Sequence, residues 1–297
     1  MRAKDVWGVL RQTASEWIDD RAMSLAASLA LYTLLSLAPV VVISVSVAGL
    51  VFGEEAARGE IASQLQGFMG PQASAGVQSV LAQASTPRSG IVGTIVGVLV
   101  LLVGASGVFS ELQETLNLVW NVKAKPGRGV RGFFRDRFFS VAMVFGVTFL
   151  LLVSLVLSTA LSAVGTFLGS HLPGGETFWQ IANFVLSFVI VAFLFGLIFK
   201  VVPDAKIRFR DVWHGALVTA LLFTLGKLGI GLYLGKAAPG SAFGAAGSLI
   251  ALIVWVYYSA QILFFGAEFT QVYAKRFGSG IVPTANAIAI DVGKTVT

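Results

Sequence analysis

The stretch SLIALIVWVYYSAQILFFGAEF, residues 248–269, decides the fold class of this chain. It has no charged residue before Glu268, and the charge-free run extends back to Ala237. A helix needs about 20 apolar residues to cross the ~30 Å of hydrocarbon in a bilayer. This stretch is long enough, and we interpret it as a membrane span.

Five further apolar blocks have the same character. The chain is 56% hydrophobic and only 12% charged, whereas soluble domains are about one quarter charged. The sequence therefore predicts an all-α polytopic membrane protein with six transmembrane helices. The six spans cover about 25–52, 90–108, 138–167, 178–202, 212–234 and 245–269.

The basic residues set the expected orientation. Six spans place both termini on one side, and that side receives 17 of the 21 Lys and Arg residues. They are Arg2, Lys4, Arg11, Arg21, Lys123, Lys125, Arg128, Arg131, Arg135, Arg137, Lys200, Lys206, Arg208, Arg210, Lys275, Arg276 and Lys294. The positive-inside rule places this side, with both termini, in the cytoplasm. Anionic lipid headgroups then account for the basic loops, and no nucleic acid is needed as a partner.

The remaining segments are assigned by composition. Residues 1–21 place apolar side chains at helical spacing and predict an amphipathic helix at the membrane interface, before the membrane domain at 22–277. The outer segment 53–88 predicts two short helices, separated at Gly70 and lying on or just above the outer surface. The small and polar residues 278–297 predict a flexible cytoplasmic tail.

Polar groups at membrane depth are costly and often functional. The candidate pathway or lock residues are Glu111, Glu114, Asn117, Asn183, Asp204, Lys227 and Glu268, with a candidate helix kink at Pro39. The three glutamates are expected at the cytoplasmic edge. There they form either an ion-pair lock with basic loop residues such as Arg135 and Arg137 or the mouth of a pathway.

Lys227 is expected about 10 Å from the outer end of its span, at the depth of Asn183. One interpretation is that its long side chain lifts the ammonium group toward water. The other is that the neighbouring glycines, Gly226 and Gly229, pack closely and turn Lys227 into an outward-facing cavity. The sequence leaves both open.

No residue pattern indicates catalysis. The chain has no cysteine and two histidines, so we expect neither a metal site nor a cofactor. Phosphate loops, nucleophile elbows and dinucleotide-binding glycines are not found in the sequence. We expect that the protein is not an enzyme.

Four long stretches carry a family resemblance. They are LALYTLLSLAPVVVI (29–43), ELQETLNLVWNV (111–122), KVVPDAKIRFRDVWHGALV (200–218) and FGAAGSLIALIVWVYYSAQILFFGAEF (243–269). They resemble the YihY/BrkB family of bacterial inner-membrane proteins, over about residues 10–277. The resemblance implies a six-helix bundle in the plasma membrane and supplies no agreed activity. Some members are called virulence factors, and a ribonuclease label on others is regarded as a misassignment. The recurring polar positions of the family look like Glu111, Asn117, Pro203, Asp204 and Glu268.

Three functions compete at this level. The first is a transporter or exporter of a small solute, an ion or an envelope amphiphile. The second is a non-transporting scaffold for envelope maintenance, and the third, a nuclease, has no supporting motif. The substrate stays unknown, and a homo-oligomer is compatible with one chain.

Overall fold

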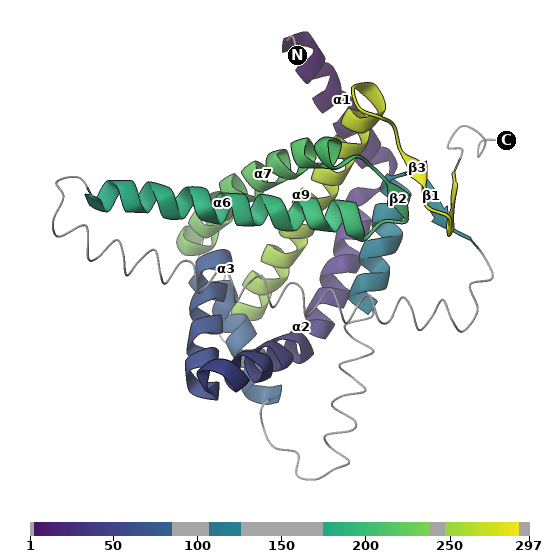
Figure 1. The fold of residues 1–297 in the computed structure, drawn as a ribbon. Helices are drawn as coiled ribbons and strands as arrows, with labels where there is room; N and C mark the ends of the chain where they lie inside the picture. The colour runs from purple at the N-terminus through teal and green to yellow at the C-terminus, as the bar shows by residue number, and fades with distance from the viewer. Residues whose placement is uncertain (1–2, 85–106, 126–174, 238–246, 291–297) are drawn as a thin grey trace.

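In a computed structural model, the described residues are 3–84, 107–125, 175–237 and 247–290, and they are mostly helical (Figure 1). The helices are α1 (Ala3–Asp19), α2 (Ala22–Phe52), α3 (Glu54–Ala84), α6 (Gly175–Val201), α7 (Phe209–Ala237) and α9 (Gly247–Arg276), with a further helix at 107–119. The strands are β1 (Val122–Ala124), β2 (Ala205–Lys206), β3 (Val282–Pro283) and β4 (Ala287–Ala289). Apolar residues form helices here because backbone groups in hydrocarbon must be paired within their own segment.

Three of the described helices are long and apolar enough to cross a membrane. They lie at Phe184–Val201, Phe209–Ile230 and Gly247–Arg276, and α2 adds a shorter apolar stretch at Ala22–Leu37. The spans predicted at 25–52, 178–202, 212–234 and 245–269 each fall almost entirely within one helix. Nearly all of 90–108, and the whole of 138–167, lie outside the described residues, so the count of six stays a prediction.

Helix α9 lies at the centre of the described bundle. It packs against α1, α2, α3 and α7, and α6 lies along α7 on the outside (Figure 1). The outer helix keeps a row of apolar side chains exposed: Phe178, Ile181, Phe184, Val185, Val189, Phe193 and Val201. An exposed apolar row of this length suits contact with lipid rather than with water.

Helices α7 and α9 approach each other closely through two glycine–threonine pairs. Thr270 of α9 occupies the space where Gly215 of α7 would carry a Cβ, and Thr219 of α7 does the same over Gly266 of α9. Each threonine hydroxyl donates to a carbonyl of its own helix, Thr219 to Gly215 and Thr270 to Gly266, both at 2.7 Å. The contact is therefore reciprocal, and both hydroxyls are satisfied without water.

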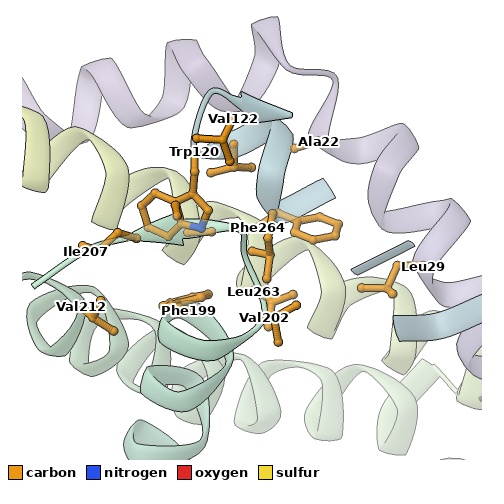
Figure 2. Close-up of a cluster of buried hydrophobic side chains, with 14 of the residues drawn as sticks. Ala22, Leu29, Trp120, Val122, Phe199, Val202, Ile207, Val212, Leu263 and Phe264 are labelled. Atoms are coloured by element: carbon orange, nitrogen blue, oxygen red, sulfur yellow. The ribbon is translucent and has the colours of Figure 1, made fainter. Parts of the chain in front are cut away.

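The largest core cluster lies near one end of the bundle, where the strands are found (Figure 2). Trp120, Phe199 and Phe264 are fully buried in it, and the Trp120 and Phe199 rings meet edge to face at 6.5 Å. Side chains from α2, the 107–119 helix, α6, α7 and α9 all enter this cluster. It fixes the relative positions of five chain segments that are distant in sequence.

Helix α3 lies toward the opposite end of the bundle and is broken in its middle (Figure 1). Gly70 adopts φ 81°, a conformation that glycine reaches easily, and Pro71 begins the second half. The break lies at Gly70, where the sequence predicts it, and the place of the two halves at the outer surface stays a prediction. Met69 and Val77 are buried in a cluster with α2 and α9, so this part of α3 belongs to the bundle.

The segment after α9 is not a loose tail in the described part of the chain. Strand β3 pairs with β2, and β4 pairs with β1, both antiparallel. The predicted flexible tail is therefore wrong for residues 282–289. The composition does not predict these strands, because they are held by backbone hydrogen bonds to the loops at 121–125 and 204–206.

Candidate functional site

The candidate site lies at the end of the bundle that carries the strands, here called the polar end: α1, residues 117–125, residues 202–211 and residues 268–283. Figure 1 shows β1, β2 and β3 beside the end of α9 and α1. Exposed basic residues from separate segments gather here: Lys4, Arg11, Lys123, Lys125, Lys206, Arg208, Arg210, Lys275 and Arg276. The segments that the sequence assigned to one side of the membrane therefore meet in space.

Asn117 and Asp204 form a reciprocal pair at the polar end. The Asn117 Nδ2 donates to Asp204 Oδ2 at 3.2 Å, and the Asp204 backbone N–H donates to Asn117 Oδ1 at 2.7 Å. Both residues are buried. Gln113 supports the same junction by donating to the Val202 carbonyl at 3.2 Å. Two of the predicted polar residues are thus brought together, where they join the 107–119 helix to the turn before β2.

Asp211 ties the start of α7 to the segment after α9. Its Oδ2 accepts from the backbone N–H and the hydroxyl of Ser279, both at 3.1 Å. A pocket of about 430 Å³ lies beside this contact, lined by Arg208, Phe209, Arg210, Asp211, Phe277, Gly278 and Ser279. Sequence reasoning missed Asp211, because an aspartate in the first turn of a helix is common for capping and dipole reasons alone.

Glu268 is the most unusual polar residue of the described chain. It lies on α9, inside a candidate span, with an exposed fraction of 0%. Neither carboxyl oxygen has a hydrogen-bond partner among the described residues. The ion-pair lock considered from the sequence is thus not formed at Glu268 by the residues described, and Arg135 and Arg137 lie outside them. A buried carboxyl without a donor is costly, so this position calls for a function.

The carboxyl group of Asp20 lies within hydrogen-bonding reach of the Glu268 carboxyl group. Asp20 follows α1, and Arg21 turns the chain into α2 with a left-handed φ of 52°. Burial raises the pKa of Asp20, and Glu16 and Asp19 raise it further, against the lowering effects of Glu268 and Lys275. Sequence reasoning missed Asp20, because two adjacent aspartates before a span look like a solvated turn.

Two more unpartnered polar groups lie in the same contact between α1 and α9. Gly8 lies against Arg276 at one end of this contact, and Asp20 lies near Glu268 at the other. Thr13 and Gln271 fall between these points, and both are fully buried with an oxygen that has no partner among the described residues. The contact therefore contains buried polar groups that are not all satisfied by the described residues.

Glu111 and Glu114 are less enclosed. Glu114 is exposed, and Glu111 is half-buried. Burial raises the pKa of Glu111, the neighbouring Glu114 raises it further, and a hydrogen bond with Ser28 lowers it. These two carboxylates lie on the 107–119 helix near α2, and the described residues place neither of them in the Asp20–Glu268 pair.

Lys227 faces outward on α7. Gly226 packs against the Tyr258 side chain of α9, and a helix turns by about 100° per residue, so the next residue leaves this contact. Lys227 is exposed, as are Leu225 and Leu228. Gly226 therefore does not turn Lys227 toward α9, and the two interpretations of the Lys227 side chain stay predictions.

The two other predicted positions are placed only by their helices. Asn183 lies on α6. Helix α2 continues through Pro39, so the kink stays a prediction. Ser36 donates to the Thr33 carbonyl at 3.0 Å.

The raised pKa of Asp20 predicts a stability that depends on pH. A carboxyl whose pKa is higher in the folded protein stabilises the fold below its ordinary pKa of 3.8, and this contribution is lost as the pH rises through the raised value. We expect the melting temperature of the full-length protein to fall by about 2–4 °C over this range, since solvent screening limits the effect. Asp20→Asn should flatten the profile, measured by thermal unfolding in detergent from pH 4 to pH 8 (about the range over which such a group titrates). An unchanged profile in Asp20→Asn would contradict the assignment.

Comparison with known proteins gives a consistent result. A family model described as "Virulence factor BrkB" matches residues 13–289. A UPF0761 membrane protein of Verminephrobacter eiseniae (strain EF01-2) is 30% identical over 270 residues, covering 89% of this chain and 62% of that one. A UPF0761 membrane protein of Alteromonas mediterranea is 26% identical, and the match covers 92% of this chain and 89% of the length of that relative.

A further UPF0761 membrane protein, from Pseudomonas paraeruginosa, is 28% identical and covers 86% of this chain and 60% of its own. The chain thus spans 60–62% of the length of the first relatives it matches. No solved structure matches the chain.

Proposed function

Since the chain belongs to the virulence factor BrkB family of membrane proteins, we propose that it is a bacterial inner-membrane protein that transports or exports a small solute, an ion or an envelope amphiphile. The proposed topology has six spans with both termini in the cytoplasm. The gathering of basic segments at the polar end supports this orientation, because cytoplasmic loops carry the excess of Lys and Arg. The relatives are named as membrane proteins, and their names describe no enzyme.

The observation that carries the transport proposal is Glu268. An ionisable group with 0% exposure on an apolar span is expensive to keep, and such groups mark ion and substrate pathways. A purely structural role would satisfy the carboxyl with donors, as Asp211 is satisfied by Ser279. Glu268 has no such donor among the described residues.

Flux through proteoliposomes tests the proposal. The full-length protein would be reconstituted and assayed with sodium, potassium and chloride, with a zwitterionic osmolyte, and with a fluorescent anionic phospholipid. We expect one of these classes to be moved, and Glu268→Gln to reduce its rate at least about tenfold, equivalent to about 1.4 kcal/mol. Glu55→Gln is the matched control, because Glu55 is exposed on α3 and is not a candidate pathway residue, and it should keep the wild-type rate.

Two outcomes would contradict the proposal. Equal flux from wild type and Glu268→Gln would remove this residue from the pathway. No flux of any probe above that of empty liposomes would count against transport itself and favour the alternative below.

The alternative function is a scaffold for envelope maintenance that transports nothing. The basic surface of the polar end, with its pocket at Arg208 and Arg210, favours this function. It predicts partner proteins that co-purify from membranes and are lost when Lys123 and Lys125 are replaced by Gln, since both are exposed. Retention of the same partners by this double variant would count against the scaffold.

A further inference from the structure

We propose that Glu268 and Asp20 form a proton-binding site in which one shared proton holds α1 against α9. The pair joins two elements: Glu268 on α9, fully buried, and Asp20 at the turn between α1 and α2. The proton is thus a ligand of Glu268, the residue on which the proposed function rests. Its test reads proton binding directly, so it succeeds or fails whether or not the protein transports a solute.

A proton is the ligand that the geometry favours. Two carboxylates accept hydrogen bonds and cannot donate them, so a hydrogen bond between them requires a proton on one of the two. The two carboxyl groups lie within reach of such a bond, and no N–H or O–H from the described residues reaches either oxygen of Glu268. Two carboxylates within hydrogen-bonding reach of each other in a buried site repel, so one shared proton is favoured over two negative charges.

The surrounding charges support the same conclusion. Glu16 and Asp19, both on α1, add negative charge near the pair, and Lys275 on α9 is the basic group that opposes them. Helix α2 contributes no charged residue to the contact, because its sequence has none. The negative groups thus outnumber the single lysine, and a proton lowers the net charge of the contact.

The consequence of proton loss falls on α1. Deprotonation would place two negative charges between α1 and α9 in a contact where Thr13 and Gln271 already have unpartnered oxygens. The apolar part of this contact is small, centred on Val9 and Val272. Trp7 and Ile18 are exposed on the outer side of α1, at 70% and 66%, and can hold the helix at a lipid surface once it leaves α9. Helix α1 would therefore dock when the proton is bound and loosen when it is released.

Infrared spectroscopy of the full-length protein in lipid nanodiscs tests the site. A protonated carboxylic acid has a C=O stretching band that is separate from the bands of a carboxylate. We expect this band at neutral pH in the wild type and its loss in Glu268→Gln. In Asp20→Asn the new amide can donate to Glu268, so the band should titrate at lower pH than in the wild type. Glu114→Gln, which changes an exposed carboxyl, should leave the band unchanged.

Several results would overturn the proposal. The wild type would show no such band at neutral pH, or Glu268→Gln would keep it. A band that disappears on adding sodium at constant pH would identify a cation site in place of a proton site. If Glu268→Gln cannot be purified, the titration of Asp20→Asn still decides, because an unshifted band would show that the two groups do not interact.

A distance measurement tests the docking of α1. The chain has no cysteine, so spin labels can be placed at chosen positions without background. Labels at Arg11→Cys and Phe277→Cys, both exposed, would report the separation of α1 from the end of α9. We expect the distance distribution to broaden and lengthen as the pH rises in the wild type and to stay fixed in Glu268→Gln. A distribution independent of pH in the wild type would rule out the docking step.

Discussion

Gly266→Ala should lower the stability of this protein by about 2–3 kcal/mol, which corresponds to a melting temperature lower by about 4–12 °C. A Cβ at Gly266 would overlap the Thr219 hydroxyl and lie 2.8 Å from its Cβ and Cγ2. Thr219 is fully buried and its hydroxyl is bonded to the Gly215 carbonyl, so the side chain has no room to move away. Gly215→Ala should have a similar effect, through Thr270.

The control for this prediction lies on α7, the helix that carries Thr219. A Cβ at Gly229 on α7 would meet nothing within 4 Å, so Gly229→Ala should lose nothing and gain up to about 1 kcal/mol from helix propensity. The double variant Gly266→Ala with Thr219→Gly should lose less than the sum of the two single changes, because the added methyl group then fills the vacated space. Thermal unfolding in detergent measures the wild type and each of these variants, including Thr219→Gly alone. Equal melting temperatures for Gly266→Ala and Gly229→Ala would mean that the close contact is not needed.

Asn117→Ala should cost about 2–4 kcal/mol, through the loss of both hydrogen bonds to Asp204. The Asp204 backbone N–H and carboxylate would then each be buried without the donor or acceptor that Asn117 supplied, at about 1–3 kcal/mol per group. We expect a melting temperature lower by about 5–10 °C. Increased proteolysis at the turn before β2, residues 202–204, should accompany it, since this turn would loosen.

A second substitution at this position separates charge from packing. Asn117→Asp keeps the volume but places a carboxylate against that of Asp204, so its stability should recover as the pH falls and one of the two groups takes up a proton. Glu114→Ala, on the exposed side of the same helix, is the control and should stay within about 0.5 kcal/mol of the wild type. A pH-independent loss in Asn117→Asp would contradict the charge argument.

The sequence was sufficient for the helices and for part of the candidate site. Long charge-free blocks gave α2, α6, α7 and α9, because length and hydropathy alone decide whether a segment can span a bilayer. The break of α3 was predictable from Gly70, whose φ of 81° is one that glycine adopts without strain. Glu268 stood out because charged residues are rare in such blocks, and Asn117 stood out through the family resemblance.

Other parts of the site could not be predicted, because they depend on contacts between distant segments. The partnership of Asn117 with Asp204 joins residues separated by 87 positions. Asp20 has an ordinary sequence context, and only the docking of α1 on α9 gives it a buried neighbour. The strands β3 and β4 have too few residues to show a period, so backbone pairing with the loops was invisible in the sequence.

The pairing of β3 and β4 has a consequence for biosynthesis. These strands follow every described helix along the chain, yet their partners β1 and β2 lie between earlier helices. The backbone edges of both loops therefore stay open while the later helices are inserted, and they close only when residues 282–289 emerge from the ribosome. A nascent chain stalled after α9 would leave two unpaired backbone edges, available to chaperones or proteases.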